Sequence, residues 1–426
     1  MNVLLLGSGG REHAMAWSIA KSDKLDKLYI APGNPGTAQH GTNVDLSLSD
    51  FDAILDFIEG NDIELTVVGP EQPLVDGITD FLEEKGHKVF GPSRLAAQLE
   101  GSKKFANEFM KENRIPTAEF ESYSRGEFDK ALKVIKSKDE YPVVLKADGL
   151  AGGKGVFICE TEEEVENRLN ELKESKQFKE AAQKLVVEEF LEGKEASVFV
   201  ISDGKTARIL HYAQDHKRIG EGDTGLNTGG MGAYCPTPVI GNRMLQRVEK
   251  EIILPTISAM LLDENPYKGI LYCGLMITKE GPKVVEFNCR LGDPEAQAIL
   301  PSIESDFLEL MDAAASEELD QKEVRIDDKY RCCVVLASEG YPVEYEKGKE
   351  ITGFGDISGD ALVFHAGTKS QDGKILTDGG RVLSVVGAGD TLEDSIRNTY
   401  QEVDKISFAN KYYRSDIGAK GLKHVS

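Results

Sequence analysis

The residues best suited to bind a metal ion lie in the segment Val284–Gln297, which reads VVEFNCRLGDPEAQ. Glu286 and Asn288 are two positions apart on a predicted strand, so both side chains face the same side of it. Two oxygen ligands on one face are what Mg²⁺ needs when nucleotide phosphates supply the rest of its octahedron. Arg290 follows at the same spacing and can bind a phosphate or a carboxylate through two hydrogen bonds. Because a buried Glu and Asn without a metal would carry a desolvation cost, the spacing predicts a metal site for phosphate chemistry.

A glycine-rich segment between two predicted strands could cover a triphosphate. In Val143–Cys159 a strand delivers Lys146, and a run with three glycines then precedes Lys154 and the next strand. Such a loop can close over phosphates as a flap, and a flexible hairpin with an incidental lysine is the alternative. The segment is not a P-loop, because Gly155 follows Lys154 where that motif needs Ser or Thr.

Carboxylates stand at the end of another apolar run, in the segment Lys184–Val198. Glu188 and Glu189 end a predicted strand, and Glu195 follows shortly after. These side chains could accept hydrogen bonds from an adenine amino group or from ribose hydroxyls. An ordinary solvated strand edge is the alternative for this motif taken alone.

The segment Gln214–Pro238 contains six glycines together with several charged and polar residues. This composition predicts a long irregular loop, and such loops are uncommon unless they bind something. Disorder is the alternative, and Met231 and Tyr234 argue against it because apolar side chains are rare in disordered segments.

A glycine-rich turn also opens the chain, in LLLGSGGREHA, between a predicted strand and a predicted helix. Backbone N–H groups at the start of a helix favour an anion. The dinucleotide fingerprint needs a third glycine where this chain has Glu12, so an NAD-dependent oxidoreductase is disfavoured. A tight turn that merely requires glycine is the alternative.

No residue is placed to act as a catalytic nucleophile. His13 and His216 are the only histidines near these loops, and no Ser–His–Asp arrangement is seen. The six cysteines show no C-x-x-C spacing, so free thiols are expected rather than a zinc site or disulfides.

Composition limits the class of protein. The 426 residues imply about two to four domains, and 29% charged residues are typical of a globular protein. A net charge of −23 argues against nucleic acid as a partner, although a phosphorylated small molecule needs only a local basic cluster. No run approaches the roughly 20 apolar residues of a membrane span, and the start of the chain does not resemble a signal peptide. A cytoplasmic location is therefore expected.

The motifs must be positioned by at least three units. Strands and helices alternate over residues 1–101, which predicts a doubly wound parallel sheet whose carboxyl-end loops bind ligands. Residues 102–326 form a second unit, with an α+β subdomain at about 120–190 that reads helix, strand, loop, strand, helix, strand. A long helix is expected over 243–262. Residues 327–426 are predicted to form a β-rich unit with a closing helix from Leu392.

Taken together and in this order, the motifs resemble the ATP-grasp superfamily, and within it the phosphoribosylamine–glycine ligases. The most specific stretches are GDTGLNTGGMGA and RLGDPEAQ, and similar stretches span Gly7 to Gly387. The resemblance implies a parallel N-terminal domain, an ATP-grasp domain with a mobile lid, and a β-rich C-terminal domain. It also implies a monomer or weak homodimer that joins glycine to 5-phosphoribosylamine through glycyl phosphate, using ATP and Mg²⁺ or Mn²⁺.

The resemblance further implies a role for individual residues. ATP would be bound by residues of the lid and its flanks: Lys104, Lys146, Gly152, Gly153, Lys154, Gly155, Glu188, Leu191 and Glu195. The two substrates would be bound by residues of several loops: Gly9, Gly10, Arg11, Asp215, Asn227, Thr228, Gly229, Gly230, Arg290, Gly292 and Asp293. The metal ligands would be Glu286 and Asn288, and the catalytic residues Arg290, Lys146 and Asp215. The flap would close before transfer, because the acyl phosphate and the aminosugar phosphate both react with water.

Two other functions remain open at this point. A different ATP-grasp ligase, such as a carboxylating purine enzyme or a biotin carboxylase, would share the fold but accept bicarbonate. A nucleotide-binding sensor without catalysis would lack a charged flap or metal residue, and the sequence retains these residues.

Overall fold

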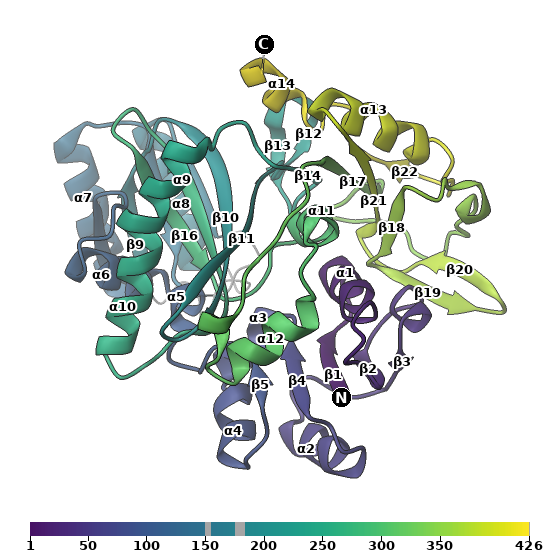
Figure 1. The fold of residues 1–426 in the computed structure, drawn as a ribbon. Helices are drawn as coiled ribbons and strands as arrows, with labels where there is room; N and C mark the ends of the chain where they lie inside the picture. The colour runs from purple at the N-terminus through teal and green to yellow at the C-terminus, as the bar shows by residue number, and fades with distance from the viewer. Residues whose placement is uncertain (150–154, 175–183, 426) are drawn as a thin grey trace.

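The structure is a computed structural model that describes residues 1–149, 155–174 and 184–425 (Figure 1). A five-stranded parallel sheet, a four-stranded antiparallel sheet and a nine-stranded antiparallel sheet make up most of it. In Figure 1 the four-stranded sheet and the C-terminal strands lie on opposite sides of the molecule. The mixed α/β and α+β architecture expected from the sequence is confirmed.

The N-terminal sheet has the strand order β3-β2-β1-β4-β5. Its strands are β1 (Asn2–Gly7), β2 (Lys27–Pro32), β3 (Thr42–Asn43), β4 (Leu65–Val68) and β5 (Val89–Phe90). Its helices are α1 (Gly10–Ile19), α2 (Phe51–Gly60), α3 (Glu71–Asp76) and α4 (Ile78–Glu84). Alternate residues of β1 enter two different hydrophobic cores, Leu4 and Leu6 in one and Val3 and Leu5 in the other. Both faces of the sheet are therefore covered, which is why Val3–Leu6 of β1 are all apolar.

One expected helix in this unit is divided. The helical pattern over residues 74–85 becomes α3 and α4, which meet at Gly77. Gly77 has a φ of +98°, a left-handed conformation that favours glycine and ends the first helix. The short helices α5 (Gln98–Gly101) and α6 (Lys103–Glu112) then lead into the next unit.

The lid subdomain is a four-stranded sheet in the order β6-β9-β7-β8, with two helices packed on it. Its elements are β6 (Phe120–Ser124), α7 (Phe128–Lys138), β7 (Val143–Ala147), β8 (Val156–Cys159), α8 (Glu162–Glu174) and β9 (Lys184–Glu189). Strand β6 was not expected from its sequence, FESYS, which has few apolar residues. It lies at the edge of the sheet and pairs with β9 alone, so long-range pairing rather than local pattern makes it a strand.

The large sheet runs in the order β16-β15-β10-β11-β14-β17-β21-β18, with β22 paired to β17. Its strands are β10 (Lys194–Asp203), β11 (Ala207–Asp215), β14 (Gly232–Cys235), β15 (Lys268–Ile277), β16 (Pro282–Asn288), β17 (Tyr330–Ser338), β18 (Leu362–His365), β21 (Arg381–Gly389) and β22 (Lys411–Tyr412). The pairing of β14 with β17 makes one continuous sheet from residues on both sides of position 327.

The other helices and strands surround this sheet. Helix α9 (Asn242–Val248) continues through a π-helical segment, Glu249–Ile253, into α10 (Leu254–Leu262), which confirms the long helix expected there. The remaining elements are α11 (Glu295–Ile299), α12 (Phe307–Ala315), β19 (Thr368–Gln371), β20 (Lys374–Thr377), α13 (Leu392–Val403) and α14 (Ala419–Val425). The six cysteines are buried free thiols, as expected.

The expectation of an irregular loop over residues 214–238 was wrong in part. The segment contains β12 (Arg218–Gly220) and β13 (Thr224–Asn227), which form an antiparallel ribbon, and β14. Gly222, with a φ of +66°, lies in the turn of the ribbon, and Gly225, with a φ of +79°, lies in β13. A Cβ on Gly232 would lie 2.7 Å from the carbonyl oxygen of Cys333, so glycine there permits β14 to approach β17.

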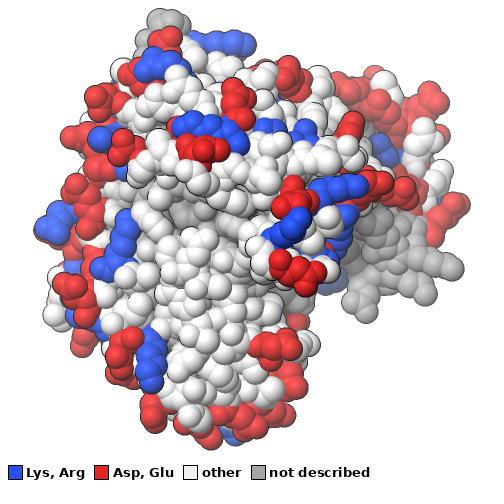
Figure 2. Space-filling model, turned by 90° about the vertical axis from the view of Figure 1, so that its right-hand side faces the viewer, with Lys and Arg blue, Asp and Glu red and all other residues white. Residues whose placement is uncertain are grey.

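The surface agrees with the composition. Figure 2 shows acidic and basic side chains interspersed, with no continuous basic area on the face in view. Within the described part of the chain, no helix combines the length and the apolar character that a membrane crossing requires.

Candidate functional site

The end of β16 presents the two predicted metal ligands as the sequence suggested. Glu286 pairs with Gly274 of β15 and Asn288 pairs with Tyr272, so the two side chains lie on the same face of the sheet. A bulge leaves Val285 without a partner in β15. The carbonyl oxygen of Val285 accepts a hydrogen bond of 2.9 Å from Lys146 Nζ, which brings the lid strand β7 next to this face.

The carboxylate of Glu286 is surrounded by positive charge. Burial by itself would raise the pKa of Glu286, but neighbouring cations outweigh burial and hold this pKa at about 2. Those cations are Lys103, Lys217, Lys146 and Arg290. An ionised carboxylate beside a set of cations is suited to a metal ion bound to polyphosphate.

Lys103, rather than its neighbour Lys104, faces this carboxylate. Lys103 Nζ lies 3.8 Å from Glu286 Oε2, and its side chain is largely buried. Lys104 is more exposed and lies 3.5 Å from Glu108, one turn along α6. The sequence singled out Lys104 for the phosphates, and in the structure Lys103 is the lysine that lies beside Glu286.

Lys146 is held by a buried ion pair. Its ammonium lies 2.6 Å from Glu188 Oε2, and each side chain is only 5% exposed. The other oxygen of Glu188 accepts a hydrogen bond of 2.8 Å from Asn107. Glu188 was expected at the adenine, and in the structure its carboxylate fixes Lys146. Leu191, the other residue expected at the adenine, is half-buried on the segment that links β9 to β10.

Part of the predicted flap lies outside the described residues, namely Gly152, Gly153 and Lys154. Gly155 is described, and its carbonyl oxygen accepts a hydrogen bond of 2.8 Å from Ala147 N.

The ends of β10 and β11 bring a second charged group to the site. Lys217 Nζ lies 3.5 Å from Glu195 Oε2. The negative charges of Glu195 and Asp215 outweigh burial and raise the pKa of Lys217 well above its usual value. The charge of Glu286 also raises this pKa.

Two buried carboxyl groups lie close together beside Lys217. Asp215, at the end of β11, is 6% exposed, and Glu295, the first residue of α11, is 4% exposed. Burial and the charge of Asp215 raise the pKa of Glu295 to about 7. Burial also raises the pKa of Asp215, and the charge of Glu195 adds to this effect. Buried carboxyl groups with raised pKa values are candidates for binding a cation or transferring a proton.

Arg290 is neutralised by two carboxylates from the N-terminal part of the chain. Its Nε lies 3.1 Å from Glu71 Oε2 and its Nη2 lies 2.8 Å from Glu100 Oε1. Burial would lower the pKa of Arg290, and these two charges outweigh burial and raise it. A ligand that binds Arg290 must therefore share it with Glu71 and Glu100.

The start of α1 is filled by carboxylates of the protein itself. Gly9 N donates a hydrogen bond of 2.6 Å to Glu12, and Arg11 N donates one of 3.2 Å to Asp293 Oδ2. The Arg11 guanidinium is directed inward, with Nε 2.7 Å from Glu12 and Nη1 3.0 Å from the carbonyl oxygen of Leu291. An anion at the start of this helix would therefore lie beside Asp293.

The predicted substrate residues of the 214–238 segment lie next to the same aspartate. Thr228 closes a turn, because its N and Oγ1 both donate to the carbonyl oxygen of Lys217, at 2.8 and 2.9 Å. Gly230 has a φ of +112°, and a Cβ there would lie 2.5 Å from Cδ of Pro294. This turn therefore packs directly on the segment that contains Gly292 and Asp293.

The structure thus brings the predicted residues together in two neighbouring groups. The group expected at the phosphates, called the phosphate side below, holds Lys146, Glu195, Glu286 and Asn288. The group expected at the substrates, called the substrate side, holds the α1 start, Asp215, the 227–230 turn and Arg290–Asp293. Sequence reasoning missed several charged residues: Lys103, Lys217, Glu295 and Arg381. Lys103, Lys217 and Glu295 each stand one or two positions from a residue that had been noticed, and this proximity is the signal that could have identified them. Arg381 directly follows two glycines, Gly379 and Gly380, which are its only local signal.

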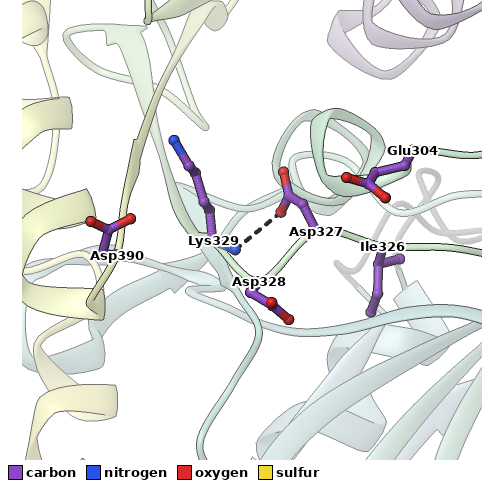
Figure 3. A pocket seen from close by; sticks show the side chains of 6 residues that line it. All are labelled: Glu304, Ile326, Asp327, Asp328, Lys329 and Asp390. Carbon is purple, nitrogen blue, oxygen red and sulfur yellow. Dashed lines mark hydrogen bonds between the residues drawn. The ribbon is translucent and has the colours of Figure 1, made fainter.

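A separate cavity of about 520 Å³ lies away from this site (Figure 3). Its lining is mainly acidic: Glu304, Ile326, Asp327, Asp328, Lys329 and Asp390. Asp327 already accepts hydrogen bonds from Lys329 N at 3.1 Å and from Arg331 Nη1 at 2.7 Å. None of the predicted site residues lines this cavity.

Known proteins share this fold and these motifs. Biotin carboxylase from Campylobacter jejuni superposes with a TM-score of 0.74 at 15% identity over 98% of each chain, which shows the fold alone. A crystal structure of phosphoribosylamine–glycine ligase from Thermotoga maritima superposes with a TM-score of 0.85 at 36% identity, over 98% of this chain and 100% of that one. The phosphoribosylamine–glycine ligase of Pasteurella multocida is 46% identical over 99% of this chain and 98% of its own.

The fold and the site together define an ATP-grasp enzyme, an ATP-dependent ligase. Three family profiles of phosphoribosylglycinamide synthetase match the chain, the N domain over residues 1–100, the ATP-grasp domain over 101–296 and the C domain over 331–420. The chain belongs to the phosphoribosylamine–glycine ligase family.

Proposed function

We propose that this chain joins glycine to 5-phosphoribosylamine at the expense of ATP, giving glycinamide ribonucleotide, ADP and phosphate in purine biosynthesis. The observation that carries the proposal is the arrangement of charges. A cationic group around Glu286 lies next to the buried carboxyl pair of Asp215 and Glu295, with Arg290 on the same strand end. This arrangement suits a small zwitterion whose carboxylate must reach a phosphate.

On the phosphate side, Lys103 and Lys146 would hold the ATP phosphates, with Lys104 as the further candidate named by the sequence. Leu191 would contact the adenine and Glu195 the ribose, while Glu188 would act by holding Lys146. Lys217 lies beside Glu195, and its charge would stabilise the transferring phosphoryl group.

Glu286 and Asn288 fit a divalent cation, Mg²⁺ with Mn²⁺ as the alternative. Glu286 is ionised at neutral pH, and Asn288 offers a second oxygen on the same face. Among the described residues no group of three or more acidic, His or Cys side chains could hold a metal, so phosphate and water oxygens would complete the shell. When bound, the ion would neutralise charge on the β- and γ-phosphates.

On the substrate side, Asp215 and Glu295 would receive the ammonium of glycine, and Arg290 would attract its carboxylate. Phosphoribosylamine would lie along Gly9–Arg11, the 227–230 turn, Gly292 and Asp293. Several protein segments converge there around the Asp293 carboxylate, whose negative charge would attract the amine of the ligand.

The reaction would proceed in two transfers. An oxygen of the glycine carboxylate attacks the γ-phosphorus, the bond from phosphorus to the β,γ-bridging oxygen breaks, and ADP leaves. The nitrogen of phosphoribosylamine then attacks the acyl carbon, the bond to the phosphate oxygen breaks, and the nitrogen loses a proton as the amide forms. Neither transfer needs a side-chain nucleophile, so the protein would act through positioning and charge.

The division of the chain into units 1–101, 102–326 and 327–426, with the lid as a mobile part, belongs to the same proposal. We also propose that the protein is cytoplasmic, that its partners are small molecules only, and that it is a monomer or a weak homodimer.

The test is release of ADP from ATP by the purified chain with Mg²⁺. We expect ADP release and amide formation only when glycine and phosphoribosylamine are both present. Bicarbonate in place of glycine tests the carboxylating alternative, and nucleotide binding without turnover under every condition would indicate a sensor.

Glycine affinity should depend on pH through Glu295. Because burial raises its pKa to about 7, Glu295 becomes protonated as the pH falls below 7 and then attracts an ammonium group less strongly. We expect steady-state kinetics to show that kcat/KM for glycine falls below pH 7. The decrease should approach about tenfold per pH unit. Glu295→Gln should give a low value with no such fall. An unchanged slope in that variant would assign the titration to another group.

A further inference from the structure

One side chain of the C-terminal strands, Arg381 at the start of β21, joins segments that lie far apart in the sequence. Its Nη1 donates hydrogen bonds of 2.7 Å to the carbonyl oxygens of both Gly229 and Asp293. The same nitrogen lies 3.3 Å from the carbonyl oxygen of Gly230 and 3.3 Å from the carboxylate of Asp293. Arg381 thus fixes the distance between the 227–230 turn and the turn at Asp293.

Asp293 extends this connection to the N-terminal sheet. Its Oδ2 accepts from Arg11 N at the start of α1, and its Oδ1 accepts a hydrogen bond of 2.8 Å from Gln297. Burial would raise the pKa of Asp293, and the charges of Arg381 and Arg11 outweigh burial and lower it. The carboxylate is therefore ionised and holds both cationic neighbours.

A tyrosine supports the same turn from the C-terminal side. The hydroxyl of Tyr341 accepts a hydrogen bond of 3.0 Å from Gly229 N. A Cβ on Gly380 would lie 2.1 Å from the Tyr341 ring, so the glycine before Arg381 makes room for the tyrosine. The motif TDGGR therefore places Arg381 and Tyr341 together against Gly229.

The β12–β13 ribbon that leads into the turn is also held by the C-terminal segment. Arg414 is only 1% exposed, and its Nη1 donates to Asp223 Oδ1 and to the carbonyl oxygen of Arg218, both at 2.9 Å. Asp416 binds the other side of the same guanidinium at 2.7 Å. The C-terminal part of the chain thus anchors the ribbon and its turn at separate points.

We propose that Arg381 is a positioning residue for phosphoribosylamine, setting the spacing between the start of α1, the 227–230 turn and Asp293. None of its hydrogen-bond partners in the described structure is a residue that we assign to ATP or to the metal. Its loss should therefore impair the second transfer and leave nucleotide binding and the first transfer intact. This inference rests on the proposed function.

The test is Arg381→Gln in the full chain. We expect KM for phosphoribosylamine to rise at least about tenfold, because misplaced binding groups are costly, while KM for ATP and for glycine stays within about twofold. More than one ADP should be released per amide formed, since activated glycine would be lost to water. Arg397→Gln is the matched control: Arg397 lies on α13 of the same domain, is exposed, and pairs only with Asp394.

A double-mutant cycle with Tyr341→Phe separates positioning from direct substrate contact. Both residues act on Gly229, so we expect Tyr341→Phe alone to raise KM for phosphoribosylamine and the double variant to be less than additive. Additive effects would mean that Arg381 contacts the substrate itself and would overturn a purely positioning role. If Arg381→Gln does not fold, as judged by thermal unfolding, Arg381→Lys and Tyr341→Phe provide the same readouts.

The inference fails if the Arg381 variants keep one amide per ADP, or if KM for ATP or glycine rises as much as KM for phosphoribosylamine. Failure of the proposed function is seen differently, as a wild-type chain that forms no amide from glycine and phosphoribosylamine.

Discussion

Replacing Glu286 with glutamine should lower kcat by on the order of a thousandfold, the equivalent of roughly 4 kcal/mol of transition-state stabilisation. Glutamine keeps the shape of the side chain but removes the charge that the surrounding lysines and Arg290 neutralise. Without the carboxylate charge of Glu286, the metal would lose its only proposed charged protein ligand. The γ-phosphate would then lose the ion that offsets its developing charge. The measurement is steady-state amide formation at saturating substrates.

Nucleotide binding separates this effect from a loss of the site. We expect Glu286→Gln to bind ATP more weakly, by about 10- to 100-fold, and still to bind it, as measured by calorimetry. Glu280→Gln is the matched control, because Glu280 lies on the turn before β16 and its side chain is 81% exposed. Full activity in Glu286→Gln would show that the metal is held elsewhere.

The second large effect concerns the ion pair between Lys146 and Glu188. Lys146→Met should reduce the free energy of unfolding by about 3–5 kcal/mol, because it leaves the Glu188 carboxylate buried without its cation. It should also lower kcat strongly, since Lys146 would no longer reach the phosphates. Chemical denaturation followed by fluorescence, together with the ADP assay, measures both quantities.

A double variant separates the two roles of Lys146. Lys146→Met combined with Glu188→Gln removes both charges and keeps an oxygen for Asn107, so most of the lost stability should return while kcat stays low. Lys136→Met is the control, because Lys136 forms exposed pairs in the lid that should contribute little to stability. Recovery of activity in the double variant would mean that Lys146 serves stability alone.

Much of the fold follows from local patterns. The run Val3–Leu6 is apolar at every position and lies in a central parallel strand, because alternate side chains enter two different cores. The segment 214–238 was harder to predict, since glycines that look like loop residues also permit tight turns and close strand packing. Gly232 is such a case, because only its contact with β17 reveals a strand.

The candidate site was predictable where residues share one strand and uncertain where a helix begins. Glu286 and Asn288 needed only the two-residue repeat of a strand to lie on one face. Lys103 and Lys104 are adjacent at the start of α6, where consecutive side chains point about 100° apart. The register of that helix against β16 decides which lysine meets Glu286, and the register is set by packing.

The sequence by itself therefore determined which strand carries the two proposed metal ligands, because a two-residue spacing is enough, and it determined the parallel N-terminal sheet through the alternation of strands and helices. The tertiary structure alone decided how the charges are paired. Lys146 meets the carbonyl of Val285 across 139 positions, and Arg381 meets Gly229 across 152. The Val284–Gln297 segment shows both sides of this division. Its strand positions were predictable, whereas burial of Glu295 beside Asp215 arises only when distant strands and a helix pack together.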